Sequence, residues 1–298
     1  MKIVIAGGTG FVGRQLVSDL SNENEVLVLT RGESKQNENV KYLKWNPYGQ
    51  DITFLSNAIS GYDAVINLTG ESIANKRWSK KEKDLILKSR VMSTRYIVDS
   101  IGKAEKRPKV LVNSSAIGYY KKNTDEELNE SSGISTDFLS KTCIMWENEA
   151  MKAAKFGVSV SIIRTGIVIG KGGILERLDK LVKYGFSAYQ KDQWLSWIDL
   201  HDLSAMVRFI VYKNLKGPFN AVSPNPVQMS GLFSMLAEIE HKKMLIRIPG
   251  FMINLLLGEM GRLLIFSSQK VIPKNAIDSG FSFGDTDLKT VLLKYLKD

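Results

Sequence analysis

KIVIAGGTGFVG, residues 2–13, is the stretch of this sequence that decides the fold. Its first part, residues 2–6, is apolar and rich in β-branched side chains, which predicts a buried strand. Gly7, Gly10 and Gly13 follow at the spacing of a dinucleotide-binding turn, and a helical segment comes next. Without side chains at these positions the chain can reverse tightly and a diphosphate can approach the backbone, where the helix N-terminus offers free N–H groups. The order of strand, glycine turn and helix therefore predicts a dinucleotide site, and a purely structural turn is the alternative.

The sequence that follows predicts an α/β fold with a Rossmann-type doubly wound parallel sheet. Apolar, β-branched runs alternate with helical segments, which is the order that builds such a sheet. Strands without polar alternation indicate that helices cover both faces. We predict strands at residues 2–6, 25–29, 40–44, 64–68, 109–113, 158–164, 194–198 and 219–222, and helices that begin near Phe11, Ile52, Lys80, Phe138 and Asp202.

The C-terminal part of the chain has a different pattern. After Gly170 the alternation weakens, and from Ser230 onward the pattern is mainly helical. We therefore expect residues 1–170, with parts of 190–225, to form an NADP-binding domain. Residues 171–298 are expected to form a smaller, mainly helical lobe on the substrate side.

The end of the second predicted strand indicates which dinucleotide binds. An NAD site usually places an acidic side chain there, which accepts hydrogen bonds from the ribose hydroxyls. This strand instead ends in Thr30 and Arg31, and the Arg31 guanidinium can pair with the 2′-phosphate of NADP. Glu33 lies close enough in sequence to return to the same place, which keeps NAD as the alternative. We predict NADP(H).

Composition and charge indicate the class of protein. Apolar residues make up 44% of the 298 residues and charged residues 24%, as in an ordinary globular protein. The 41 Lys and Arg residues exceed the 31 Asp and Glu residues, giving a net charge of +10. The cations are spread along the chain, so we expect no nucleic-acid partner. The single cysteine, Cys143, and the absence of a leader pattern predict a reducing, cytoplasmic location.

Neither a membrane anchor nor a metal site is expected. The apolar stretch at residues 251–266 is interrupted by Glu259 and Arg262 and is too short to span a bilayer. It predicts buried or amphipathic helices and no membrane partner. His201 and His241 lie far apart in sequence and belong to no cluster with metal-ligand spacing.

Motifs along the whole chain carry a resemblance to a known family. They are GGTGFVG (7–13), NLTGE (67–71), KRW (76–78), SR (89–90), SSAIGYY (114–120), RTGIVIG (164–170), WIDLHDL (197–203), LGEM (257–260), Pro273 and GFSF (280–283). Together they resemble the atypical extended short-chain dehydrogenase/reductases called epimerase family proteins. Those proteins carry a C-terminal domain of unknown function, which corresponds here to about residues 245–298. The resemblance implies a Rossmann fold, bound NADP(H) and nearness to nucleotide-sugar epimerases.

The resemblance also implies which residues line the cofactor cleft, in addition to the turn and the end of the second strand. The predicted set is Gly7, Thr9, Gly10, Phe11, Val12, Gly13, Thr30, Arg31, Asn67, Leu68, Gly70, Glu71, Arg90 and Ile167. Ile167 is expected at the nicotinamide end of the cleft. A surface salt bridge is the alternative interpretation of Arg90.

The usual catalytic residues of this class are only partly present. Short-chain dehydrogenases use a serine, a tyrosine that moves the proton, and a lysine four residues later. Ser115 fits the serine role at the end of the fifth main strand. When the next helix is aligned on residues 146–147, the tyrosine position holds Leu139 and the lysine position holds Cys143. Neither side chain can do the usual proton work.

Two interpretations of this gap are open. Either Tyr119 or Tyr120, just beyond Ser115, supplies the proton, or both tyrosines pack in the core. Lys141 is offset by two residues onto another helix face, and Cys143 as a nucleophile would need an activating base. Our hypothesis assigns Ser115 and Tyr119 to catalysis.

The sequence thus predicts an NADP(H)-dependent oxidoreductase or epimerase acting on a small hydroxyl- or carbonyl-bearing substrate, such as a sugar derivative. The alternative is a catalytically silent NADP(H)-binding sensor or scaffold. Tyr189, Trp194 and Trp197 would form an apolar wall beside the nicotinamide, or else pack in the core. Related folds dimerise through helices beside the fourth and fifth strands, which makes a homodimer one assembly to consider.

Overall fold

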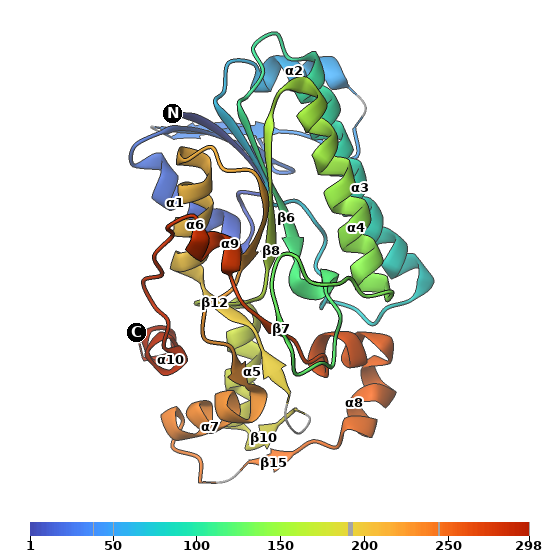
Figure 1. Cartoon of the computed structure of the whole chain (residues 1–298), viewed down its shortest axis with the longest axis vertical. Coiled ribbons are helices and arrows are strands. Elements are labelled where there is room, and N and C mark those ends of the chain that lie inside the picture. The colour runs from blue at the N-terminus through green and yellow to red at the C-terminus, as the bar shows by residue number, and fades with distance from the viewer. Residues whose placement is uncertain (38, 50, 190–192, 244, 298) are drawn as a thin grey trace.

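A computed structural model describes residues 1–298 apart from 38, 50, 190–192, 244 and 298. A central sheet runs through the upper part of the molecule (Figure 1). Its strands are β1 (Lys2–Ala6), β2 (Glu25–Thr30), β3 (Lys35–Asn37), β4 (Val40–Lys44), β5 (Ala64–Asn67), β6 (Val110–Ala116), β8 (Ser159–Thr165) and β13 (Gly217–Ala221).

The strand order of this eight-stranded sheet is β13-β8-β6-β5-β1-β2-β4-β3. All neighbouring strands are parallel except β3, which runs antiparallel to β4. From β1 the chain builds outward to β2 and β4, and then returns to the other side of β1 with β5. The predicted Rossmann-type doubly wound sheet is therefore confirmed, and its strand order reverses between β1 and β5.

Helices cover both faces of the sheet, as the uninterrupted apolar strands predict. The helices are α1 (Phe11–Ser21), α2 (Ile52–Ile59), α3 (Lys80–Lys103), α4 (Phe138–Met151), α5 (Gly173–Lys183), α6 (Leu200–Tyr212), α7 (Met229–Ile239), α8 (Gly250–Leu257), α9 (Lys274–Asp278) and α10 (Leu288–Leu296). Short 3-10 turns form η1 (Ile117–Tyr119) and η2 (Lys152–Phe156), and a π turn forms η3 (Gly261–Ile265). Helices α1 and α6 pack against one face, while α2, α3 and α4 pack against the other.

Side-chain caps explain where several of these helices begin. Ser79 accepts a hydrogen bond from the Glu82 N–H at the start of α3, which begins at Lys80 as predicted. The spacing of Ser79 and Glu82 is that of a capping box. Asp199 caps α6 in the same way, so this helix begins at Leu200, slightly before the predicted start at Asp202.

A separate core supports the lower, mainly helical lobe, which agrees with the predicted fold class. Its buried residues come chiefly from α5, α7, α8 and α10 and include Trp197, which is fully buried. Trp197 is therefore a core residue rather than part of an exposed wall. Short strand pairs complete the fold: β9 (Ile167–Ile169) with β12 (Trp197–Asp199), β10 (Phe186–Ser187) with β15 (Ile246–Arg247), β11 (Trp194–Leu195) with β14 (Val227–Gln228), and β7 (Glu127–Leu128) with β16 (Lys270–Val271).

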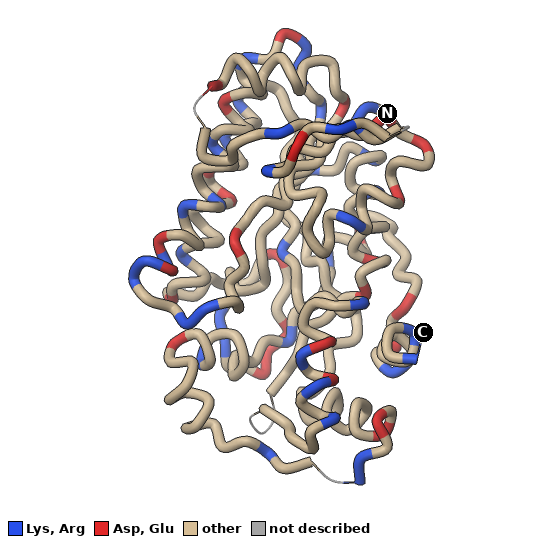
Figure 2. The backbone as a smooth tube through the Cα atoms, turned by 180° about the vertical axis from the view of Figure 1, so that it is seen from behind, with Lys and Arg blue, Asp and Glu red and all other residues tan. Residues whose placement is uncertain are grey.

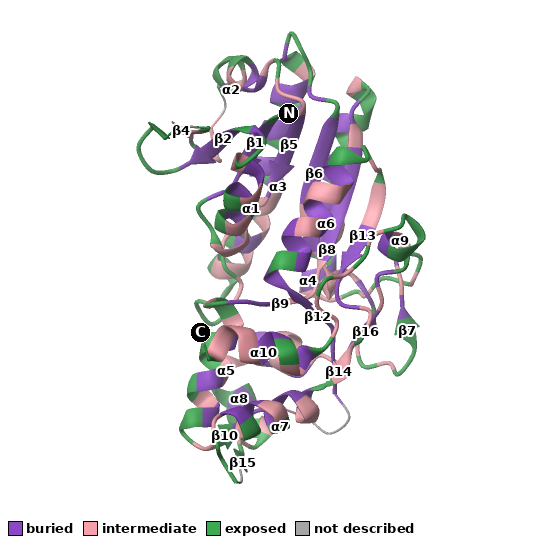
Figure 3. Ribbon diagram, turned by 90° about the vertical axis from the view of Figure 1, so that its left-hand side faces the viewer, coloured by how far each residue is buried: buried purple, intermediate pink, exposed green. Residues whose placement is uncertain are grey.

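Burial and charge follow this architecture. Figure 3 shows buried residues along the sheet and exposed residues on the outer helix faces and in the lower lobe. Figure 2 shows lysines and arginines distributed over the backbone and mixed with acidic residues. Within the described part of the chain, no helix is both long and apolar enough to cross a bilayer.

Candidate dinucleotide site and the residues around it

The predicted site residues converge at the carboxyl edge of the sheet. The strands β1, β2, β5, β6 and β8 are parallel, so the segments that follow them emerge at one edge. Gly7 follows β1 and Leu68 follows β5, on the two sides of the point where the strand order reverses. Ligands of doubly wound sheets bind in the crevice at this point.

The glycine turn has no room for side chains. Gly7 has φ +84°, and a Cβ there would lie 3.0 Å from the Leu68 backbone. A Cβ on Gly13 would lie 2.2 Å from the Gly7 carbonyl oxygen and 2.7 Å from the Gly8 Cα. These are backbone atoms that cannot turn aside as a flexible side chain would. Glycine is therefore required here for the close approach of α1 to β1.

The turn leaves the start of α1 open to an anion. The Gly10 N–H donates to the Gly7 carbonyl at 3.0 Å, and Gly10 occupies the N-cap position without a side chain. The first turn of α1 also contains no acidic residue. By contrast, α3, α4 and α6 each begin with a Ser or Asp side chain that accepts their free N–H groups. The first-turn amides of α1 are thus available to a ligand phosphate.

A hollow of about 690 Å³ lies between the start of α1 and the ends of β2 and β4. Thr9 and Thr30, both predicted as cofactor residues, line it. Two cations that the sequence reasoning did not single out, Arg14 and Lys35, line it as well. Arg14 donates to the Thr9 carbonyl at 2.9 Å, which holds its guanidinium beside the turn. The position of Arg14, one turn into the helix that follows the glycine turn, could have identified it from the sequence as a residue near the site.

Arg31 reaches across to Glu71 instead of into this hollow. Their side chains form a salt bridge at 3.0 Å, with 70% of the Arg31 side chain exposed. Glu33, the residue that kept NAD as an alternative, pairs with Lys44 at 2.7 Å. Tyr48 lies close enough to Glu71 to be influenced by it: burial raises the pKa of Tyr48, and the Glu71 charge adds to the effect.

The end of β5 is shaped by buried hydrogen bonds. Asn67 is fully buried, and its amide donates to Asn113 at 2.7 Å and to Thr94 at 2.9 Å. Its side-chain oxygen accepts from the backbone N–H and the hydroxyl of Thr69. These contacts fix the turn that brings the Leu68 backbone against Gly7. Asn67 therefore lies in the protein interior and holds the turn after β5 in position.

Arg90 closes the crevice beside Gly70. A Cβ on Gly70 would lie 3.1 Å from the Arg90 guanidinium carbon, so glycine permits this contact. The guanidinium donates to the carbonyls of Glu71 and Ile86 and lies 5.1 Å from the centre of the Trp146 ring. Burial lowers the pKa of Arg90. The surface salt bridge considered as an alternative is not among the interactions of the described residues.

The loop after β5 also contacts the lower lobe. Arg177 on α5 donates to the Ala74 carbonyl at 3.1 Å. Lys83 at the start of α3 pairs with Glu259, just before η3. The loop and the start of α3 are therefore each bonded to a segment of the lower lobe.

Ser115 belongs to a buried ionic network that the sequence did not predict. Its hydroxyl donates to the Glu147 carboxylate at 2.6 Å. Arg164 holds both oxygens of Glu147, with contacts of 3.0 and 2.8 Å. Burial acts to lower the pKa of Arg164, but the hydrogen bonds and charge of Glu147 outweigh it and raise the pKa. Leu139, Cys143 and Glu147 recur every four residues on one helix face, which could have indicated Glu147.

The two candidate tyrosines differ sharply. Tyr120 is fully buried, donates to Asn220 at 2.7 Å and accepts from Arg164 at 2.9 Å. Burial raises the pKa of Tyr120 to about 12, so it stays a neutral structural group. Tyr119 is half-buried, and its ring lies over Arg164 with 3.6 Å between the guanidinium carbon and the ring centre. Within the described residues its hydroxyl has no hydrogen-bond partner, so it is the freer of the two to act on a substrate.

Leu139 and Cys143 do not replace the missing tyrosine and lysine. Both are buried, and the Cys143 thiol lies 3.7 Å from the Ala116 carbonyl. Burial raises the pKa of this thiol to about 11, with the Glu147 charge contributing. The thiol is therefore neutral near pH 7 and supplies neither a cation nor a nucleophile.

The remaining predicted positions have structural settings of their own. Ile167 is half-buried in β9, where it pairs with Trp197 and donates its N–H to the Ser196 carbonyl at 2.9 Å. His201 lies against Tyr295, and His241 occupies a turn with φ 53°. No cluster of potential metal ligands occurs among the residues that the structure describes.

Two family models match the chain. Residues 3–220 match the NAD dependent epimerase/dehydratase family, and residues 248–294 match a domain of unknown function, DUF1731. The chain is also similar to the epimerase family protein YfhF of Bacillus subtilis. The two are 34% identical over 308 aligned residues, which cover 100% of this chain and 99% of the relative.

Solved structures show the same fold. The human epimerase family protein SDR39U1, crystallised with NADPH, has a TM-score of 0.85 and 24% identity, with 100% of both chains covered. A nucleoside-diphosphate sugar epimerase from Corynebacterium glutamicum has a TM-score of 0.79 and 28% identity. That alignment covers 99% of this chain and 58% of the other, so this chain spans little more than half of that relative.

Proposed function

The chain belongs to the NAD dependent epimerase/dehydratase family, and we propose that it binds NADP(H) at the carboxyl edge of its sheet to oxidise, reduce or epimerise a small hydroxyl- or carbonyl-bearing substrate. A sugar derivative is the proposed substrate class, which the similarity to a nucleoside-diphosphate sugar epimerase supports. The observation that carries the proposal is the turn with Gly7 and Gly13, where side chains would not fit, followed by helix α1, whose N-terminus has no side-chain cap. Residues 1–170 with parts of 190–225 would hold the cofactor, and residues 171–298 the substrate.

The residues at the edge fit a dinucleotide. The turn brings bare backbone to the first-turn amides of α1, which suits a diphosphate. The turn lies where the strand order reverses, with Gly7 packed against the Leu68 backbone. When bound there, NADP(H) would supply the hydride donor or acceptor. In this proposal the chain's own residues bind it through Thr9, Gly10, Phe11 and Val12.

The charges near the end of β2 support NADP(H) over NAD(H). Arg14 and Lys35 line the hollow, and Arg31 follows β2 next to it. Glu33 also lines the hollow, but its carboxylate pairs with Lys44. In the proposal, Arg31 exchanges its salt bridge with Glu71 for the 2′-phosphate, which carries more negative charge than a carboxylate. The human relative crystallised with NADPH adds support.

Arg31→Ala is expected to weaken NADPH binding by about tenfold and to leave NADH binding nearly unchanged. Loss of one charge-assisted hydrogen bond at an exposed position accounts for an effect of this order. Calorimetric titration with both cofactors measures it. Arg107→Ala is the matched control, because Arg107 is exposed and its guanidinium contacts the Gly102 carbonyl and the Phe156 ring near the far end of α3. Equal losses for NADPH and NADH would show that Arg31 does not read the phosphate.

The proposed catalytic residues are Ser115 and Tyr119. A serine hydroxyl has a single proton, and the bond to Glu147 uses it. In this arrangement the lone pairs of the Ser115 hydroxyl oxygen point away from Glu147. They can accept a hydrogen bond from a substrate hydroxyl. Donation to a substrate carbonyl requires Ser115 to release Glu147. Tyr119, whose hydroxyl has no hydrogen-bond partner among the described residues, is the proposed source or acceptor of the proton.

Ser115→Ala and Tyr119→Phe are each expected to lower turnover by about 100-fold or more while NADPH binding is retained, as for the loss of a general acid–base group. The assay incubates the protein with NADPH or NADP⁺ and a panel of nucleotide sugars and small carbonyl compounds. Absorbance of the reduced nicotinamide and chromatography of epimers follow the reaction. Tyr212→Phe, at the end of α6, is the matched control. Full activity of both site variants would exclude these roles.

A second candidate function is a silent NADP(H)-binding sensor or scaffold. Leu139 and the neutral thiol of Cys143 at the usual proton-transfer positions favour it, as does the commitment of the Ser115 proton to Glu147. Tight NADPH binding without turnover of any compound in the panel would support this candidate and exclude the enzyme on those substrates.

A further inference from the structure

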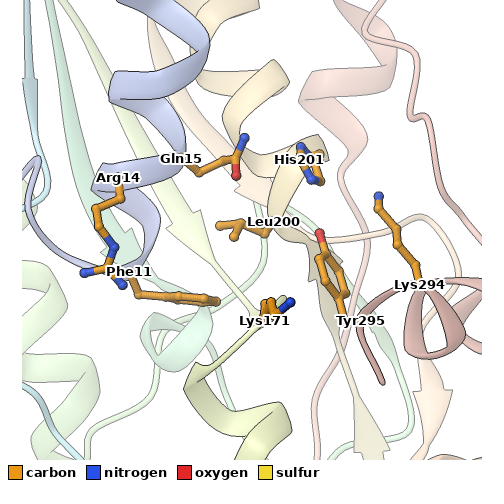
Figure 4. Close-up of a pocket in the computed structure, with 8 residues that line it drawn as sticks. All are labelled: Phe11, Arg14, Gln15, Lys171, Leu200, His201, Lys294 and Tyr295. Atoms are coloured by element: carbon orange, nitrogen blue, oxygen red, sulfur yellow. The ribbon is translucent and has the colours of Figure 1, made fainter. Parts of the chain in front are cut away.

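A second hollow lies outside the proposed cofactor crevice. It has a volume of about 460 Å³ and is enclosed by the start of α1, the segment after β9, the start of α6 and the C-terminal helix α10 (Figure 4). Of the residues assigned to the cofactor, Phe11 lines it through its ring, and Arg14 lines both this hollow and the one beside β2. The volume is within the range of small-molecule sites, and it belongs to neither the crevice nor the Ser115 network.

The side chains around this hollow carry positive charge. Arg14, Lys171 and Lys294 line it, and no Asp or Glu is among its described lining residues. Arg14 bonds to the Thr9 backbone carbonyl, and Lys171 forms no ion pair with a described residue. Only Lys294 is neutralised, by Asp199 at 3.2 Å and Asp285 at 2.9 Å. Arg14 and Lys171 are thus the lining cations without a carboxylate partner among the described residues, and an anion would bind on their side of the hollow, away from Asp199 and Asp285.

Flat ring side chains form the rest of the wall. Phe11, His201 and Tyr295 face the same space in Figure 4. The His201 and Tyr295 rings are nearly parallel, with 3° between their planes and 6.3 Å between their centres. Such faces suit a planar ring, and cations beside them suit an acidic group attached to it.

The wall supplied by α10 is held in place. The Tyr295 hydroxyl donates to the buried Asp199 carboxylate at 2.7 Å, and Lys294 bonds to the same carboxylate. Asp199 in turn caps α6. Burial and the Asp199 hydrogen bond raise the pKa of Tyr295, so its hydroxyl remains a donor. The α10 wall of the hollow is thus fixed by its bonds to Asp199.

We propose that this hollow is a binding site for a small organic phosphate that carries a planar ring. Lys171 and Arg14 hold the phosphate, while His201, Tyr295 and Phe11 contact the ring. The helices at its rim come from two different family matches, because α1 and α6 lie within residues 3–220 and α10 overlaps residues 248–294. A ligand here would bridge these two parts of the chain.

The test uses phenyl phosphate as the probe and the full chain saturated with NADPH. Calorimetric titration is expected to show one bound phenyl phosphate with a dissociation constant in the millimolar range or lower, and weaker binding of inorganic phosphate, which lacks the ring. Lys171→Glu is expected to weaken phenyl phosphate binding at least tenfold, because it reverses the charge of an exposed side chain at the site. His201→Ala is expected to remove the preference for phenyl phosphate over inorganic phosphate. Lys213→Glu, on an exposed lysine after α6, is the matched control.

Three outcomes would overturn the site: no binding at millimolar probe, binding that disappears when NADPH is added, or equal affinities in the Lys171→Glu and Lys213→Glu proteins. The second outcome would mean that the probe occupies the dinucleotide crevice. NADPH affinity is measured in parallel on each variant. If the protein binds no NADPH, the proposed function fails, and the same comparison of variants without NADPH still decides whether this hollow binds the probe.

Discussion

Arg164→Met is expected to destabilise the protein by about 3–5 kcal/mol, the usual consequence of removing one partner from a buried ion pair. Arg164 and Glu147 are 5% and 8% exposed, so the carboxylate would be left charged in a water-poor interior. The substitution also removes the donor to the Tyr120 hydroxyl at 2.9 Å and the cation under the Tyr119 ring. Urea unfolding at neutral pH, followed by circular dichroism, measures the free energy of unfolding.

Two comparisons separate this effect from the loss of a charge in general. Arg95→Met removes a side chain that is 55% exposed and pairs with Glu149. It is expected to cost less than about 1 kcal/mol, because Glu149 keeps its ion pair with Lys152. The double variant Arg164→Met with Glu147→Leu is expected to recover part of the lost stability, because no unpaired charge then remains inside. If the Arg164→Met protein proved as stable as the natural chain, Glu147 could not be held as an ion in the interior.

Gly13→Val is expected to reduce NADPH binding by more than about 100-fold, since binding through the turn depends on aligned backbone amides. A Cβ at Gly13 would fall 2.2 Å from the Gly7 carbonyl oxygen, so α1 must move away from β1 to admit it. That movement displaces the first-turn amides from the crevice. Calorimetry gives the affinity, and circular dichroism shows whether the fold is retained.

Gly231→Ala is the matched glycine control for this experiment. Gly231 lies in α7, and a Cβ there would meet no atom within 4 Å. Alanine at that position is expected to be neutral or to stabilise the helix by up to about 1 kcal/mol. NADPH binding by the Gly13→Val protein at the natural affinity would remove the main support for the dinucleotide site.

Local sequence was enough to predict the sheet and the glycine turn. The strand at residues 2–6, the glycine turn and the start of α3 at its capping box each depend on neighbours a few residues away. The alternation of apolar strands and helices then specified a parallel sheet, because strands buried on both faces need crossover helices. The crevice followed from that topology, because parallel strands end at one edge.

The partners of the site residues could not be predicted in the same way. Arg31 meets Glu71 across 40 positions of sequence, and Ser115 meets Glu147 across 32. Choosing between Tyr119 and Tyr120 required knowing which ring is fully buried and bonded to Asn220. Each of these contacts depends on how distant elements pack.

By itself, then, the sequence determined the fold class and the glycine-lined turn, because periodicity and the absence of a Cβ act locally. Tertiary structure alone decided that the Ser115 proton goes to a buried carboxylate, that Arg31 is held by Glu71, and that α10 closes a basic hollow beside α1. The physical reason is that hydrogen-bond partners and local charge are set by which side chains meet in space, and no short-range pattern encodes that meeting.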